Sequence, residues 1–101
     1  MSEFTKVAAK SEIAPGYTKK VEINGKEIAV FNIGGNFCAI ADTCSHRGGP
    51  LSEGSVENNV VTCPWHGWEY DVTNGSCLTN PSVTQAKYDV KVDGGDIYVS
   101  A

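Results

Sequence analysis

The chain has 101 residues, of which 41% are hydrophobic and 20% charged, and a formal net charge of −4 at pH 7. This length allows one domain with one modest core, and the composition is that of a globular protein. The acidic balance argues against nucleic acid or an anionic membrane surface as the main partner.

Short alternating runs separated by turn residues predict strands along the first half of the chain. The expected strands cover 4–9, 17–23, 26–33 and 37–41. The strongest local signal is Asn24-Gly25 between the second and third strands. It favours a type I′ hairpin, because both residues tolerate a positive φ. Residues 11–16 are expected to form at most one helical turn.

The second half continues in the same way, with no convincing helix of two turns. A strand pair is expected over 55–63, and further strands over 68–72, 76–79, 87–92 and 96–100. In the 87–92 strand, Tyr88, Val90 and Val92 are expected on one face and charged residues on the other. The predicted fold class is all-β, a compact antiparallel sandwich or barrel.

No apolar run approaches the roughly 18 residues of a membrane span. The first residues do not resemble a secretory signal. We therefore expect a soluble, cytoplasmic protein in which thiols stay reduced. Four cysteines in such a compartment suggest metal chemistry before a disulfide framework.

Two Cys/His pairs interrupt the strands. They are Cys44-x-His46 and, after sixteen further residues, Cys63-x-x-His66, and they use both histidines of the chain. Each pair lies in a turn-rich loop, and the hairpin between them would return the second loop beside the first. We predict that two thiolates and two imidazoles converge at one tip of the sheet.

The mixed composition of each pair bears on the metal. A structural zinc site also takes two Cys and two His, but its usual pattern pairs Cys with Cys and His with His. One Cys and one His from each loop suit a two-iron, two-sulfide cluster with unlike ends. Zinc, or no metal, remains the alternative.

The segments "CSHRG" and "CPWHGW" resemble the loops of Rieske-type ferredoxins and of the Rieske domains of ring-hydroxylating oxygenases. The resemblance covers essentially the whole chain. It implies a Rieske-like antiparallel β-sandwich formed by a single domain, 1–101, with a cluster-binding part of about 42–82 inserted in a basal β part. It also implies one [2Fe-2S] cluster, with the ligands Cys44, His46, Cys63 and His66.

The resemblance further informs the reduction potential. High-potential respiratory members carry an additional cysteine in each loop, at positions that correspond to Gly49 and Trp65 here. They also place a serine where this chain has Trp68, whereas Tyr70 is kept. Loss of a hydroxyl donor to sulfur destabilises the reduced state. We expect a low-to-middle potential within the range of about −150 to +300 mV of such clusters.

The remaining candidates have simpler interpretations. Pro81 matches a shielding third loop of the family, although Asn-Pro is also an ordinary turn signal. Trp65 and Trp68 are expected to pack around the cluster. Cys38 and Cys77 are expected to be buried or partly buried free thiols, with a disulfide between them as the alternative.

The expected function is one-electron transfer without catalysis. An oxygenase needs a mononuclear iron held by two histidines and a carboxylate, and both histidines are already used. The resemblance implies a monomeric carrier between a flavin-dependent reductase and a terminal oxygenase or another redox acceptor. Alternatives are a Rieske-like small subunit of a nitrite reductase, an isolated Rieske domain, a redox-sensing binding module, and a zinc-bound structural protein.

Overall fold

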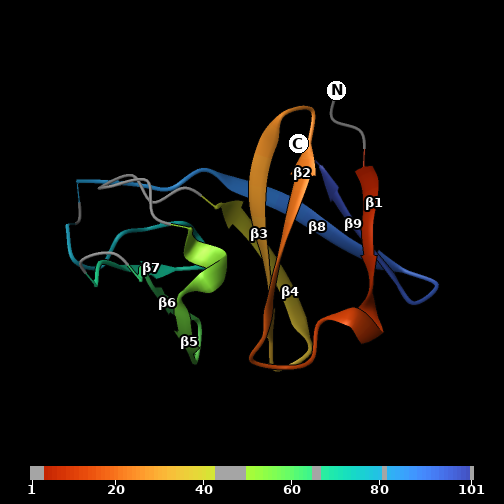
Figure 1. Ribbon diagram of the computed structural model, residues 1–101, viewed down its shortest axis with the longest axis horizontal. Coiled ribbons are helices and arrows are strands. Elements are labelled where there is room, and N and C mark those ends of the chain that lie inside the picture. The colour runs from red at the N-terminus through yellow and green to blue at the C-terminus, as the bar shows by residue number, and fades with distance from the viewer. Residues whose placement is uncertain (1–3, 43–49, 65–66, 81, 101) are drawn as a thin grey trace.

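The computed structural model describes residues 4–42, 50–64, 67–80 and 82–100. These residues form two antiparallel sheets (Figure 1), a six-stranded one in the order β1-β9-β8-β4-β3-β2 and a three-stranded one in the order β5-β6-β7. The predicted all-β class is confirmed. The elements are β1 Phe4–Ala9, η1 Lys10–Glu12, β2 Thr18–Ile23, β3 Lys26–Ile33, β4 Asn36–Ala41, η2 Leu51–Glu53, β5 Ser55–Glu57, β6 Val60–Thr62, β7 Glu69–Asp71, β8 Lys87–Asp93 and β9 Asp96–Ser100.

The hairpin of β2 and β3 confirms the strongest local prediction. Ile23 pairs with Lys26, so the turn contains two residues only. Both have a positive φ, 51° at Asn24 and 79° at Gly25. This is the geometry whose twist matches that of the flanking strands.

The predicted strand over 76–79 is wrong. This segment makes only two isolated bridges, Tyr70 to Cys77 and Ser76 to Thr84. The chain turns again after Cys77, whose N–H donates to the carbonyl oxygen of Val83 (3.1 Å). The segment therefore passes beside β7 and curls into a loop instead of extending the sheet.

The alternation expected over 87–92 holds in part. Tyr88 and Val90 are half-buried against the core, but the side chain of Val92 is 42% exposed. Only Ala39 and Ile40 of β4 pair with β8, at its first two residues. The far end of β8 pairs with β9 alone.

Strand β3 is buried on both faces, from Ile28 to Asn32. Ile28 and Val30 pack in a core with residues of β1, β2, β4 and β9. Ala29 and Phe31 point the other way, into a core that contains residues of the small sheet. A strand covered on both sides needs a continuous apolar run, and this explains the sequence IAVF at its centre.

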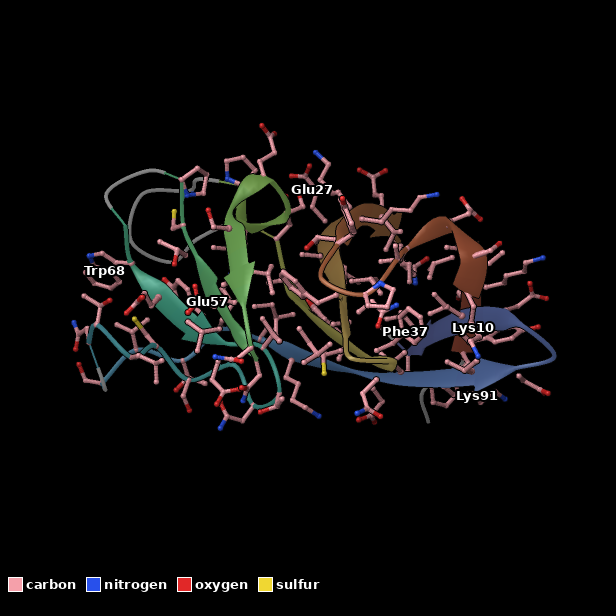
Figure 2. All side chains as sticks on the ribbon, turned by 90° about the horizontal axis from the view of Figure 1, so that it is seen from below. Lys10, Glu27, Phe37, Glu57, Trp68 and Lys91 are labelled. Atoms are coloured by element: carbon pink, nitrogen blue, oxygen red, sulfur yellow. The ribbon has the colours of Figure 1, made fainter. Side chains whose placement is uncertain are left out.

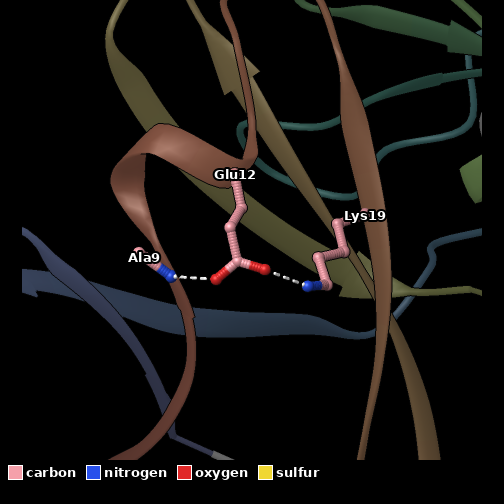
Figure 3. A network of polar contacts seen from close by, with 3 residues as sticks. All are labelled: Ala9, Glu12 and Lys19. Atoms are coloured by element: carbon pink, nitrogen blue, oxygen red, sulfur yellow. Dashed lines mark hydrogen bonds and ion pairs between the residues drawn. The ribbon is translucent and has the colours of Figure 1, made fainter.

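The 3₁₀ turn η1 is held against β2 by one carboxylate. Glu12 accepts hydrogen bonds from the backbone N–H of Ala9 (2.7 Å) and from the ammonium group of Lys19 (Figure 3). The Ala9 hydrogen bond, followed by the Lys19 hydrogen bond, lowers the pKa of Glu12. This group therefore favours the folded state above its ordinary pKa of 4.5, and the contribution is lost as the pH falls through the lowered value.

None of the helices among the described residues is long and apolar enough to cross a membrane.

Gly75 makes a close approach that no other residue type allows. Its φ is +80°, and a Cβ there would lie 2.3 Å from the carbonyl oxygen of Gln85. Its own carbonyl accepts a hydrogen bond from the Gln85 N–H (2.7 Å). This contact holds the segment after β7 against the chain that enters β8.

We predict that Gly75→Ala destabilises the fold more than Gly25→Ala. Gly25 has nearly the same φ, +79°, but nothing lies within 4 Å of a Cβ there. The Gly25 variant should lose about 1–2 kcal/mol through backbone strain alone. The Gly75 variant should lose about 1–3 kcal/mol more through steric overlap. Urea unfolding of both variants measures the difference, and equal losses would contradict the proposed close contact.

Candidate metal centre

The first Cys/His loop is fastened at its two ends by Asp42. The backbone carbonyl of Asp42 accepts the N–H of Leu51 (2.7 Å), and its carboxylate accepts the N–H of Ser52 (2.7 Å). The N–H of Asp42 donates to the carbonyl of Glu27 (3.0 Å), which ties this junction to the β2–β3 hairpin. Asp42 as a whole residue is only 2% exposed to solvent. The chain that enters the loop and the chain that leaves it are therefore held together by buried hydrogen bonds.

The strand before Asp42 is fixed from the side by Gln85. The side-chain amide of Gln85 donates to the carbonyl of Ala41 (2.8 Å), and the N–H of Ala41 donates to the carbonyl of Ala86 (2.8 Å). Gln85 is almost fully buried, 3% exposed. The start of the first loop is thus attached to the segment that follows the third.

The second Cys/His loop is a tight turn between β6 and β7. The N–H of Cys63 donates to the carbonyl of Trp68 (2.7 Å), and the N–H of Gly67 donates to the carbonyl of Cys63 (3.2 Å). Gly67 has a φ of +72°, a conformation that glycine adopts without strain. These two hydrogen bonds join the residues at the start and the end of the loop, and Cys63 at its start is 1% exposed.

A third loop follows Cys77. It is closed by the N–H of Cys77 to the carbonyl of Val83 and tightened by the N–H of Asn80, which donates to the sulfur of Cys77 (3.3 Å). The side chain of Asn80 accepts hydrogen bonds from the N–H and the hydroxyl of Ser82 (3.2 and 2.7 Å). Pro81, the predicted shielding residue, lies outside the described residues.

The bases of all three loops insert into one hydrophobic core, the core between β3–β4 and the small sheet. It contains Leu51 after the first loop, Cys63 and Tyr70 on either side of the second, and Cys77 before the third. Each of the four is at most 2% exposed. The shared core brings together loop bases that are far apart in the sequence.

Of the four predicted ligands, only Cys63 lies within the described residues. Cys44, His46 and His66 lie outside them. Among the described residues, no three His, Cys, Asp or Glu side chains gather to form a metal site. Cys63 lies directly after β6 and is 1% exposed, and its thiolate is the form that would bind a metal. Two thiolates and two imidazoles are the donors that an iron–sulfur cluster with unlike ends requires.

The outcome for the other candidate residues is mixed. Trp68 is half-buried against the shared core, as expected for a packing residue, and Tyr70 is fully buried in it. Trp65 lies outside the described residues. Cys38 and Cys77 are free thiols, so the alternative of a disulfide between them is wrong. Burial raises the pKa of the Cys38 thiol, with Lys87 opposing the shift.

Two residues that support the loops were not found from the sequence. Asp42 carries a recognisable signal, because Asp at the start of a loop often accepts nearby backbone N–H groups. Gly54 carries none. A Cβ at Gly54 would lie 2.1 Å from the carbonyl oxygen of Thr62, so its role depends on a contact with β6 that only the fold creates.

Most of the chain matches one known protein family. Residues 3–92 match the family described as "Rieske [2Fe-2S] domain". One relative is the biphenyl 2,3-dioxygenase ferredoxin component of Rhodococcus jostii (strain RHA1). It is 36% identical over 97 residues, which are 95% of this chain and 91% of the relative.

Two solved structures have nearly the same fold. One is the complex of reduced oxygenase and oxidised ferredoxin in carbazole 1,9a-dioxygenase, with a TM-score of 0.90 and 35% identity, covering 96% of this chain and 92% of the matched chain. The other is described as a putative NADH-dependent nitrite reductase small subunit from Mycobacterium tuberculosis. Its TM-score is 0.93 at 25% identity, and the match covers 100% of this chain and 96% of that one.

We predict that Asp42→Ala weakens the attachment of the first loop while Asp42→Asn largely preserves it. Alanine leaves the partly buried N–H of Ser52 without its acceptor, which costs about 1–3 kcal/mol. Asparagine keeps an oxygen in the same place. The measurements are urea unfolding and the rate at which the purified protein loses iron. Equal behaviour of the alanine variant and the wild type would show that this hydrogen bond does not hold the loop.

Proposed function

The chain belongs to the Rieske [2Fe-2S] domain family, and on this premise we propose that it is a one-electron carrier that passes electrons from a flavin-dependent reductase to a terminal oxygenase or a similar redox acceptor. The observation that carries this proposal is the single core that receives the bases of all three loops, with Cys63 buried among them. An electron carrier needs such a rigid support, because its redox centre has to change oxidation state with little rearrangement.

The proposed ligands are Cys44 and Cys63 on one iron and His46 and His66 on the other. When bound, the cluster supplies a site that accepts and releases one electron. The chain's own part is to hold the ligands in place and to exclude water from the sulfur side. Leu51, Tyr70 and Cys77 would contribute to this, since they pack in one core with Cys63 and are nearly inaccessible to solvent.

The site lacks a hydroxyl donor at the position where high-potential members of the family carry a serine. Trp68 stands there, and its indole contributes an apolar surface that is half-buried against the shared core. We assign a low-to-middle potential to the centre on this ground, with the buried Tyr70 opposing the decrease in part. Such a potential suits an intermediate between a flavin and an oxygen-activating protein.

We further assign the chain as a single domain, 1–101, that works as a monomer in the cytoplasm and is not itself an enzyme. Support comes from the relative that is named as the ferredoxin component of biphenyl 2,3-dioxygenase. The ferredoxin of the carbazole system is seen in complex with its oxygenase. Contacts between electron-transfer proteins are usually small, below about 1,200 Å² in total, so a partner can bind and leave quickly.

A second candidate function is that of a small subunit in a larger redox complex. The observation that favours it is the full-length similarity to the nitrite reductase small subunit, with a TM-score of 0.93. The carrier and the subunit share a fold and differ in the lifetime of their contacts. The difference is therefore one of binding and can be measured.

A turnover experiment tests the carrier. The protein, purified without oxygen, should be reduced within seconds by NADH and a catalytic amount of a flavin-dependent ferredoxin reductase. It should then pass its electron to an oxidised ring-hydroxylating oxygenase in repeated cycles. Stoichiometric co-purification with a large flavin- or haem-containing chain, without free exchange, would instead establish the subunit.

We predict that His66→Cys shifts the reduction potential strongly downward. A thiolate adds negative charge at the iron that accepts the electron, so the value should move toward the roughly −400 mV of all-cysteine plant-type ferredoxins. Protein-film voltammetry measures the shift. Cys38→Ser is the matched control, since Cys38 is a thiol of β4 that is not among the proposed ligands.

The measured potential and cluster content of this variant test the assignment of His66 as a ligand. If the variant keeps its full iron and sulfide content and an unchanged potential, His66 is not a ligand. If the variant binds no cluster at all while Cys38→Ser binds it normally, His66 is still required at the site.

A further inference from the structure

The net charge of the chain lies entirely in its cluster-binding part. Residues 42–86 contain one basic side chain, Arg47, and five acidic ones, Asp42, Glu53, Glu57, Glu69 and Asp71. The rest of the chain has seven lysines and seven carboxylates and is neutral. Figure 2 shows this separation: Glu57 lies on the small sheet, whereas Lys10 and Lys91 lie at the opposite end of the molecule.

The ion pairs follow the same division. All four that the described residues form join lysines of the six-stranded part to carboxylates of that part: Lys6–Asp96, Lys19–Glu12, Lys20–Glu27 and Lys87–Asp89. Neither Glu57 nor Glu69 takes part in an ion pair with another residue that the structure describes. Both are exposed to solvent. Their charge is therefore available to another molecule.

These two carboxylates belong to one face of the small sheet. Side chains alternate along its strands, so Val61 and Tyr70 point inward and are fully buried. The neighbours of Val61 and Tyr70 along these strands, Val60, Thr62 and Glu69, point outward. Leu78 extends this face, because its N–H donates to the carbonyl of Glu69 (2.7 Å). We call the set the outer face; it consists of Ser55, Glu57, Val60, Thr62, Glu69 and Leu78.

The outer face has two apolar side chains in a shallow groove. The groove has a volume of about 290 Å³ and is lined by the outer face together with Asn58. Leu78 is 51% exposed and is one of four large hydrophobic side chains in the described residues with an exposed fraction above about 40%. Val60 is half-buried in the same groove. Exposed apolar side chains beside carboxylates are the composition of a protein-binding surface.

The outer face borders the second Cys/His loop on both sides. Thr62 directly precedes Cys63, and Glu69 directly follows Trp68. Thr62 and Glu69 pair with each other across β6 and β7, at the base of the turn that contains the proposed ligands. A protein seated on this face would therefore contact the residues that flank the second Cys/His loop on both sides.

We propose that the outer face is the docking surface for a redox partner that presents an apolar contact surrounded by Lys and Arg side chains. This inference rests on the proposed function as an electron carrier. Leu78 and Val60 supply the apolar contact, and Glu57 and Glu69 attract and orient the basic rim. Since the opposite end of the molecule is neutral, the acidic end turns toward the partner during approach.

Electron transfer to mitochondrial cytochrome c tests the surface. This haem protein is used as the probe because lysines surround its exposed haem edge. The reduced holoprotein is mixed with the oxidised probe in a stopped-flow instrument at low ionic strength. The double variant Glu57→Gln/Glu69→Gln should lower the second-order rate constant about fivefold or more and flatten its salt dependence. Leu78→Ala should lower it about fivefold, with the salt dependence kept.

Matched controls come from the six-stranded part. Val92→Ala removes a side chain of similar exposure, 42%, and Glu22→Gln/Asp93→Asn removes two exposed charges. Both should react as the wild type does. A small uncharged quinone should oxidise all the variants at the same rate, which would show that the cluster and its potential are unchanged.

Each outcome decides between the proposals. If the wild type reacts with the probe and the outer-face variants react equally fast, the docking surface is wrong and the carrier function stands. If the wild type forms a dimer at low salt that Leu78→Ala abolishes, a second copy occupies the face, and the proposal is also wrong. If the intact holoprotein reduces neither the probe nor the quinone, the proposed function fails.

Discussion

The hydrophobic core between β3–β4 and the small sheet is the feature on which the rest of the structure depends. Three loops that are separated in sequence start or end at residues buried in this core: Leu51, Cys63, Tyr70 and Cys77. Each buried aliphatic or aromatic side chain contributes about 1.5–3 kcal/mol, so the loop bases are held by the same burial that stabilises the sheet. Local hydrogen bonds then fix the details, with Asp42 closing the first loop and the Cys63–Trp68 turn closing the second. A site assembled in this way keeps its geometry while its charge changes.

The molecule divides its tasks between two ends. The six-stranded part is neutral in sum and contains the ion pairs that the described residues form, so its surface has little net attraction for a charged partner. The part with the Cys/His loops carries the whole negative charge. Strand β3 links the two, since its alternate residues face one core and then the other. The six-stranded part can therefore stabilise the fold, and the acidic part can attract a basic partner.

The sequence predicted the fold where local signals were strong. The Asn24-Gly25 turn and the strands β1, β3 and β9 were predicted to the residue, because turn chemistry and alternation act over a few positions. The segment 76–79 was misread as a strand, since its pairing is interrupted by the Gly75–Gln85 contact and by the loop after Cys77, both of which depend on residues remote in sequence. For the site, the Cys and His types indicated the cofactor. The contact of Asp42 has a sequence signal that was not used, whereas the supporting contacts of Gly54 and Gln85 depend on the fold.

The assignment of an iron–sulfur cluster is tested most directly by one measurement on protein that has been purified without oxygen. Iron and acid-labile sulfide are quantified, and the same sample is reduced for electron paramagnetic resonance. A Rieske centre predicts two irons and two sulfides per chain and a rhombic signal of one unpaired electron. Protein that contains zinc and no inorganic sulfide would contradict the assignment.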